Sequence, residues 1–92
     1  MDFIYQKNRI ALYDNEKPEK MLAEVTFPST DSDTVEINHT FVDDSLRGQG
    51  IAGKLMTAAA QELRRQEKKA VLSCSYAVKW FEKHPEYQDV LK

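Results

Sequence analysis

Cysteine is almost absent from this sequence, in which Cys74 is the single one among 92 residues. One cysteine cannot form a disulfide within the chain, and no cysteine–histidine spacing matches a zinc site. Long apolar runs are also missing: none approaches the length that crosses a bilayer, and the N-terminal residues lack the basic and apolar parts of an export signal. We therefore expect one domain, residues 1–92, in the cytoplasm and without a metal.

An excess of charge of one sign is missing as well. The chain has 13 basic and 15 acidic residues, for a net charge of −2, and the two signs are interspersed. Nucleic acids and anionic membrane surfaces attract proteins through a basic face. We therefore expect neither as a partner. The open edges of so small a sheet are compatible with a monomer or a weak dimer.

Proline is scarce, and each of the three prolines falls at a predicted break in the chain. Pro18 lies in a polar connection, Pro28 begins a turn, and Pro85 ends a helix. Between the first breaks apolar and polar residues alternate, which is typical of strands. Three strands in an antiparallel meander are predicted: 3–13 with a kink or turn near Asn8, 21–27 and 34–42.

A 3.6-residue period of apolar side chains, from Ile51 to Leu63, predicts a helix over 50–67. A short apolar stretch at 70–75 predicts a fourth strand, which the strand–helix–strand connection makes parallel to the third. Residues 76–83 suit a second helix. The fold class expected is α+β: a mixed sheet, made of the antiparallel meander and the parallel strand, with a long helix and a short C-terminal helix.

Glycine is the third scarce residue, and all three glycines, Gly48, Gly50 and Gly53, fall between the third strand and the long helix. Such a concentration brings another backbone, or a phosphate, close to the chain. The free N–H groups of a helix start point outward, and the helix dipole adds about half a positive charge there. The stretch predicts an anion site. A glycine-rich turn needed only for helix–sheet contact is the alternative.

The same stretch carries a family resemblance. Arg47-x-x-Gly50-x-Ala52 resembles the acetyl-CoA pyrophosphate loop of the GCN5-related N-acetyltransferases, which has Gln/Arg-x-x-Gly-x-Gly/Ala between a strand and a helix. The whole run from Leu46 to Leu55 is similar to the family pattern.

The C-terminal part adds to this resemblance. Trp80-Phe81-Glu82-Lys83 is similar to a family segment in which an aromatic pair and Glu-Lys precede a loop. The resemblance covers residues 34–87 and the strand meander before them. It is closest to the shortest, acetyltransferase-like members, because no segment corresponds to the helices between the first two strands, or to the last two strands, of larger members.

The resemblance implies acetyl-CoA as the bound small molecule, with no metal. Its diphosphate would lie on the backbone of the glycine loop, and its pantetheine arm would pair with the end of the third strand. Lys54, Lys79 and Lys83 are candidates for the 3′-phosphate, although a solvated surface lysine is the ordinary alternative. The predicted acetyl-CoA-binding residues are Phe41, Val42, Arg47, Gly48, Gln49, Gly50, Ile51, Ala52, Gly53, Lys54 and Lys79.

In the short subgroup, a histidine on the strand before the loop and a cysteine at the end of the next strand are the proposed active residues. His39 and Cys74 match these positions. The amine acceptor is unknown, because the elements that usually shape its pocket are not in this sequence.

The residues themselves give a similar prediction. Alternation along the third strand places His39 on one face with Val35, Ile37 and Phe41. Such a histidine is either a hydrogen-bonded core residue or a functional one, and a lone cysteine such as Cys74 is usually a small buried hydrophobe. Both are expected near the C-terminal ends of parallel strands, where open sheets bind ligands. We therefore expect both to meet the glycine loop at one site.

The chemistry would be acyl transfer from a thioester, by one of two routes. An amine attacks acetyl-CoA directly while His39 removes its proton, or Cys74 accepts the acetyl group first as a thiolate beside His39. Tyr76 either donates a proton to the leaving CoA thiolate or packs on the sheet, and Trp80 and Phe81 are expected in the core. The predicted function is an N-acetyltransferase acting on a small-molecule or protein amine; a non-catalytic acyl-CoA-binding or protein-interaction module is the alternative.

Overall fold

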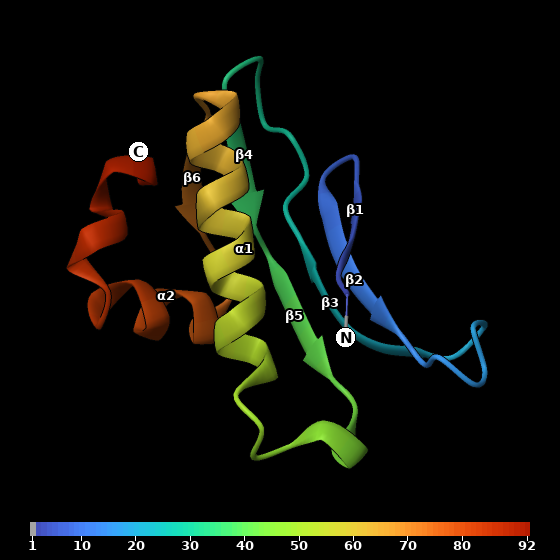
Figure 1. The fold of residues 1–92 in the computed structure, drawn as a ribbon. Coiled ribbons are helices and arrows are strands. Elements are labelled where there is room, and N and C mark those ends of the chain that lie inside the picture. Colours follow the sequence, from blue (N-terminus) through green and yellow to red (C-terminus); the bar gives the residue numbers. More distant parts are fainter. Residues whose placement is uncertain (1) are drawn as a thin grey trace.

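The computed structural model describes residues 2–92, so Met1 of the predicted domain lies outside the described residues (Figure 1). The strands are β1 (Ile4–Gln6), β2 (Arg9–Tyr13), β3 (Met21–Thr26), β4 (Thr34–Ile37), β5 (His39–Val42) and β6 (Lys69–Leu72). The helices are α1 (Ile51–Gln66) and α2 (Ser75–Glu82), with two 3-10 segments, η1 (Asp44–Leu46) and η2 (Pro85–Val90). The predicted α+β class is confirmed.

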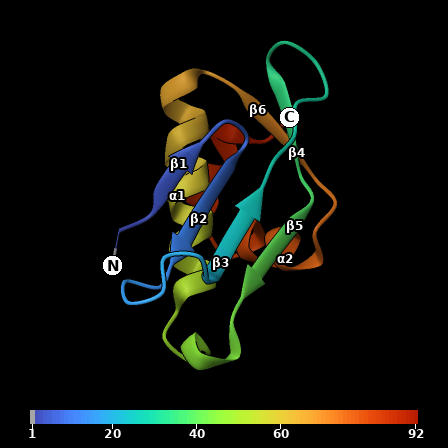
Figure 2. The same ribbon diagram turned by 90° about the vertical axis from the view of Figure 1, so that its right-hand side faces the viewer.

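The strands form an antiparallel sheet in the order β1-β2-β3-β5 and a parallel pair, β4 with β6 (Figure 2). The predicted parallel pairing across the long helix is confirmed. Of the kink or turn expected near Asn8 in the strand over 3–13, the structure has a turn. Strands β1 and β2 form a hairpin, because Asn8 takes a left-handed conformation with φ 61° and reverses the chain. Asparagine tolerates this conformation better than most residues.

The strand expected over 34–42 is divided at Asn38. Thr26 pairs with His39, and Ser29 pairs with Val35. The step from Thr26 to Ser29 is three residues, but the step between their partners, from Val35 to His39, is four. The extra residue is a β-bulge. The Asn38 N–H donates to the Thr26 carbonyl at 3.3 Å, and its side-chain oxygen accepts from the Thr26 hydroxyl at 2.6 Å.

The bulge reverses which side chains face the core. Val35 and Ile37 are buried, as predicted, but His39 is half-exposed and Val42 packs against the core instead. Thr40 is paired with Val25, a fully buried residue of β3. The expectation that His39 and Phe41 share a face with Ile37 is therefore wrong, because one inserted residue inverts the two-residue alternation.

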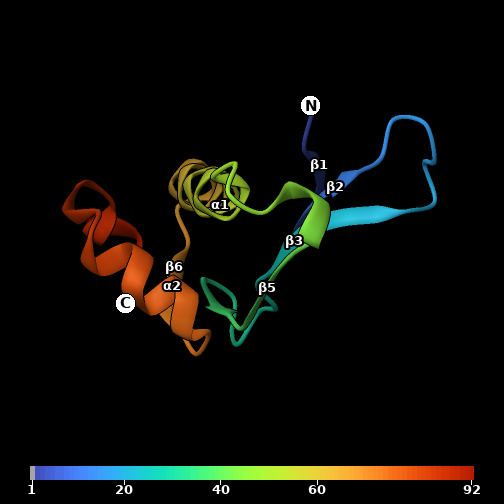
Figure 3. The same ribbon diagram turned by 90° about the horizontal axis from the view of Figure 1, so that it is seen from below.

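Helix α1 covers one face of the sheets, and within residues 2–92 no helix lies on the other face (Figures 2 and 3). Its buried stripe includes Ile51, Leu55, Met56 and Leu63. The chain from α2 to η2 packs beside α1 and β6, and there Trp80 and Phe81 are buried as predicted. No helix in the described part is long and apolar enough to cross a membrane.

Deletion of Asn38 tests the role of the bulge. With Asn38 removed the alternation runs on unbroken and keeps its present faces, with Ile37 and Val42 toward the core and His39 away from it. We therefore expect the deletion to cost little more than the hydrogen bonds between Asn38 and Thr26, about 1–2 kcal/mol of the free energy of unfolding. Deletion of Thr40, a regularly paired residue of the same strand, instead turns Phe41 toward the core and Val42 outward, and should cost about 3 kcal/mol or more.

Urea denaturation of the two deletion variants and the parent measures both effects. A deletion of Asn38 that costs as much as the deletion of Thr40 would contradict the assignment of the bulge.

Candidate functional site

The first turn of α1 has no partner for its backbone N–H groups among the side chains of residues 2–92. Gly50 is the N-cap residue, with φ 73°, and it has no side chain that could accept a hydrogen bond. No acidic residue lies in the first turn. The N–H groups of Ile51, Ala52 and Gly53 have no acceptor within the helix. Together with the helix dipole, these groups form a site suited to an anion.

Backbone conformation requires glycine at two positions of this loop. Gly48 and Gly50 have φ values of 84° and 73°, which side-chain-bearing residues rarely adopt. A Cβ atom at either position would meet nothing within 4 Å, so backbone conformation rather than crowding demands glycine. At Gly53 a Cβ atom would lie 3.7 Å from both Trp80 Nε1 and Tyr76 Oη, which is ordinary contact. The start of α1 therefore lies directly against α2.

Beside this helix start, β5 and the chain after β6 separate. The parallel pairing ends at Ile37 and Leu72. The N–H groups of Ser73 and Cys74 both donate to the Ile37 carbonyl, at 3.1 and 3.2 Å, and α2 then begins. Within the described residues, β5 pairs with β3 alone. Its other edge is therefore unpaired, and Figure 3 shows β5 and α2 leading away from each other.

The register identifies which backbone groups lie on the unpaired edge. The Asp43 N–H donates to the Leu22 carbonyl at 2.7 Å, and backbone direction alternates along an antiparallel strand. Phe41 therefore points its N–H and C=O groups toward β3, while Thr40 and Val42 point theirs toward the open side. Of the two residues predicted to meet the pantetheine arm, the geometry favours Val42, and it adds Thr40 in place of Phe41.

Cys74 and His39 lie on opposite faces of β5. The Cys74 thiol is half-buried and lies 3.6 Å from the Thr40 hydroxyl, across the open side of the strand. The His39 ring is 52% exposed, and its Nε2 lies 3.3 Å from a carboxylate oxygen of Glu24. Since Thr40 and His39 are adjacent in a strand, their side chains project to opposite faces. The expected convergence of the two side chains is not found.

The other predicted residues surround the helix start. The Tyr76 hydroxyl faces the first turn of α1, as its approach to Gly53 indicates, and partial burial raises the pKa of the phenol, so that it stays protonated at neutral pH. Arg47 forms an exposed ion pair with Asp44 at 2.8 Å. Lys54, at the end of that turn, is exposed.

Two further predicted lysines, Lys79 and Lys83, are exposed on or just beyond α2. Among the described residues, no cluster of histidine, cysteine and acidic side chains could hold a metal ion.

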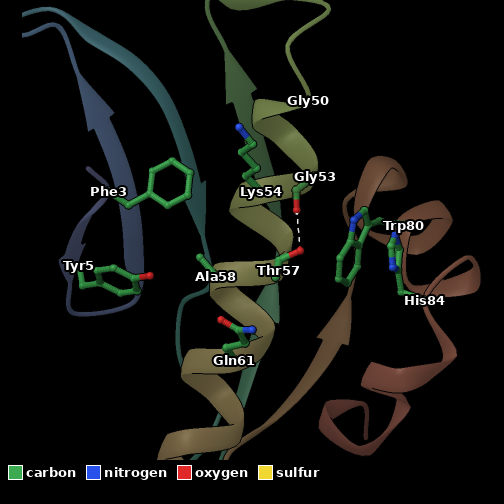
Figure 4. Close-up of a pocket in the computed structure, with 10 residues that line it drawn as sticks. All are labelled: Phe3, Tyr5, Gly50, Gly53, Lys54, Thr57, Ala58, Gln61, Trp80 and His84. Carbon is green, nitrogen blue, oxygen red and sulfur yellow. Dashed lines mark hydrogen bonds between the residues drawn. The ribbon is translucent and has the colours of Figure 1, made fainter. Parts of the chain in front are cut away.

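A cavity of about 560 Å³ begins at the same helix start and was not predicted. Phe3 and Tyr5 lie on one side of α1, and Trp80 and His84 lie on the other (Figure 4). The two rings of the α2 side stack, with centroids 4.0 Å apart. Chain segments so distant in sequence give no sequence signal for a shared cavity, although the four-residue spacing of Trp80 and His84 indicates neighbours on a helix.

Comparison with known proteins identifies the fold family. A family model described as GCN5-related N-acetyltransferase matches residues 9–90. A GCN5-like protein from Staphylococcus aureus, solved by NMR, superposes with a TM-score of 0.79 and 35% identity, covering 99% of this chain and 87% of that one. The ribosomal-protein-S18-alanine N-acetyltransferase of Escherichia coli has a TM-score of 0.63 over 88% of this chain and 50% of its own; at 20% identity it shows a similar fold alone.

Curated relatives include Protein NATD1 from two vertebrates. The Xenopus tropicalis protein is 40% identical over 52 residues, which are 56% of this chain and 48% of the frog protein. The human protein is 39% identical over 51 residues, covering 55% and 45%. The matches span about half the length of these relatives. Because the family model covers nearly all of the sequence, the chain belongs to the GCN5-related N-acetyltransferase family.

Proposed function

We propose that this protein binds acetyl-CoA and transfers its acetyl group to an amine. The observation that carries the proposal is the proximity of two unsatisfied sets of backbone groups: the first turn of α1 and the unpaired edge of β5. The first set suits a diphosphate, and the second suits the amide groups of a pantetheine arm. Coenzyme A contains both, separated along one extended molecule.

The bound donor would run from the cavity to the strand edge. Its diphosphate would accept hydrogen bonds from the N–H groups of the glycine loop, and its pantetheine arm would pair with Thr40 and Val42. The cavity that starts at Gly50 and Gly53 has a volume within the usual range for small-molecule sites, about 300–1,000 Å³, and has room for the nucleotide end. Lys54 lines it and would neutralise phosphate charge.

Direct attack by the acceptor agrees best with the positions of the side chains. The amine nitrogen forms a bond to the thioester carbon, the carbon–sulfur bond breaks, and CoA leaves as a thiolate. His39, on the uncovered face of the sheet, would accept the proton that the amine loses. Tyr76, whose phenol is protonated at neutral pH, would supply a proton to the sulfur. A Cys74 acyl-enzyme is less favoured, because His39 faces Glu24 rather than the thiol.

Turnover by single variants separates these roles. With acetyl-CoA and a panel of amines, polyamines and lysine peptides, we expect release of free CoA to fall roughly 10²- to 10⁴-fold in His39→Ala, the usual contribution of a general base. Cys74→Ala should keep most of the rate. The two-step route would instead be supported if Cys74→Ala lost turnover and mass spectrometry detected an acetylated form of the parent enzyme. No release by the parent across the panel would leave a non-catalytic acyl-CoA-binding module.

Alkylation of Cys74 reports occupancy of the strand edge without any turnover. Because it is the single cysteine, labelling by a maleimide is unambiguous. Desulfo-CoA, which has no thiol of its own to consume the maleimide, should cover Cys74 when it is bound along Thr40. At a concentration of 100 Kd, mass action should slow labelling by up to about 100-fold. Labelling that is unchanged at saturating desulfo-CoA would show that the ligand does not lie beside this thiol.

The two glycine positions at the start of α1 provide a matched pair for the diphosphate site. Gly50→Ala forces a side chain into the left-handed region at a cost of about 1–2 kcal/mol, so we expect weaker CoA binding and lower stability. Gly53→Ala has space for its methyl group and gains up to about 1 kcal/mol of helix propensity. It should retain affinity. Calorimetric titration and denaturation measure both; equal affinities would contradict the proposed loop geometry.

A further inference from the structure

The uncovered face of the sheet carries a connected group of polar side chains from four strands. Glu24 of β3 accepts a hydrogen bond from Arg9 Nε of β2 at 2.7 Å through one carboxylate oxygen. Its other oxygen lies 3.3 Å from His39 Nε2 of β5. Arg9 also donates to the Tyr13 hydroxyl at 3.1 Å and to the Gln6 side chain. Glu24 is 16% exposed and Arg9 24%, so this is no loose surface pair.

Strand register holds these three groups together. Arg9 and His39 both pair with Thr26, one from each side of β3. Glu24 lies two residues along β3 on the same face, so it reaches Arg9 and His39 as diagonal neighbours, a distance that long side chains span. The bulge at Asn38 is necessary for this arrangement, because it turns His39 to the uncovered face.

The Glu24 contact orients the imidazole. His39 Nε2 faces a carboxylate oxygen at 3.3 Å, and a carboxylate only accepts hydrogen bonds, so the contact is attractive when Nε2 carries a proton. In the neutral ring Nδ1 then carries the lone pair that can accept a proton.

We propose that Glu24 is a positioning residue for His39, with Arg9 holding the carboxylate in place. This proposal rests on the acetyl-transfer function, in which His39 accepts the proton of the attacking amine. One carboxylate oxygen of Glu24 faces Arg9 and the other faces His39. Arg9 therefore orients the carboxylate, and the carboxylate orients the imidazole. The hydrogen bond to Glu24 also raises the pKa of the Arg9 guanidinium.

A structural ion pair is the competing explanation, and it predicts different kinetics. Partly exposed pairs contribute up to about 1 kcal/mol to stability, and their loss does not alter a proton-transfer step. A positioning carboxylate instead affects turnover more than donor binding. The charged groups described around His39 are Glu24 from β3 and, beyond it, Arg9 from β2.

Glu24→Gln, with Glu36→Gln as the matched control, tests the proposal. Both replacements remove one carboxylate from a neighbouring strand, but Glu36 bonds Ser73 and not His39. In Glu24→Gln we expect kcat to fall roughly tenfold or more, which is a part of the rate contribution of a general base, while KM for acetyl-CoA stays unchanged.

The outcomes are distinguishable. A lower kcat at an unchanged KM in Glu24→Gln, absent in Glu36→Gln, supports the positioning role. An active parent with an unaffected Glu24→Gln overturns it while leaving the acetyltransferase function intact. A parent that turns over no amine overturns both, because His39 then has no proton to accept. If Glu24→Gln is unstable, Arg9→Gln takes its place. It should lower kcat by a smaller factor than expected for Glu24→Gln, again with KM unchanged.

Discussion

The hydrogen bonds that Asn38 makes to Thr26 mark the point where one strand changes partners, and the site depends on that change. Before this residue the chain pairs with β6, and after it the chain pairs with β3. A continuous strand would have carried both pairings along its length and left no unpaired edge beside the glycine loop. The bulge also turns His39 to the face that α1 leaves uncovered. One inserted residue thus produces both the open strand edge and the separation of His39 from Cys74.

The helix start and the strand edge are coupled because the chain passes from one to the other within a short segment. β5 leads through η1 into the glycine loop, and Asp43 closes the turn by accepting hydrogen bonds from the Ser45 N–H and hydroxyl, which lower the pKa of its carboxyl. Gly50 then ends the loop with an uncapped helix N-terminus. A ligand with a phosphate at one end and amides along its length can satisfy both sets of groups at once, whereas either set alone would suit many molecules.

Much of the fold follows from local patterns in the sequence. The 3.6-residue period of α1, the parallel strand after it and the burial of Trp80 and Phe81 all depend on regular spacing or on connection rules, and all are confirmed. The hairpin at Asn8 was predicted only as a kink or turn, and the bulge at Asn38 was missed, because asparagine at a single position does not distinguish a kink, a turn and an inserted residue. The error at Asn38 was the larger one for the site, since it reversed the face assigned to His39. The Glu24–His39 contact and the cavity beside Phe3 join segments that no local pattern connects.

Residue-resolved NMR during titration with CoA tests most directly whether the strand edge and the helix start act as one site. The account predicts that the amide resonances of Thr40 and Val42 move together with those of residues 48–53 and Cys74, along one binding curve. Movement of the glycine loop alone, with the β5 edge unchanged, would contradict it, as would a complete absence of shifts.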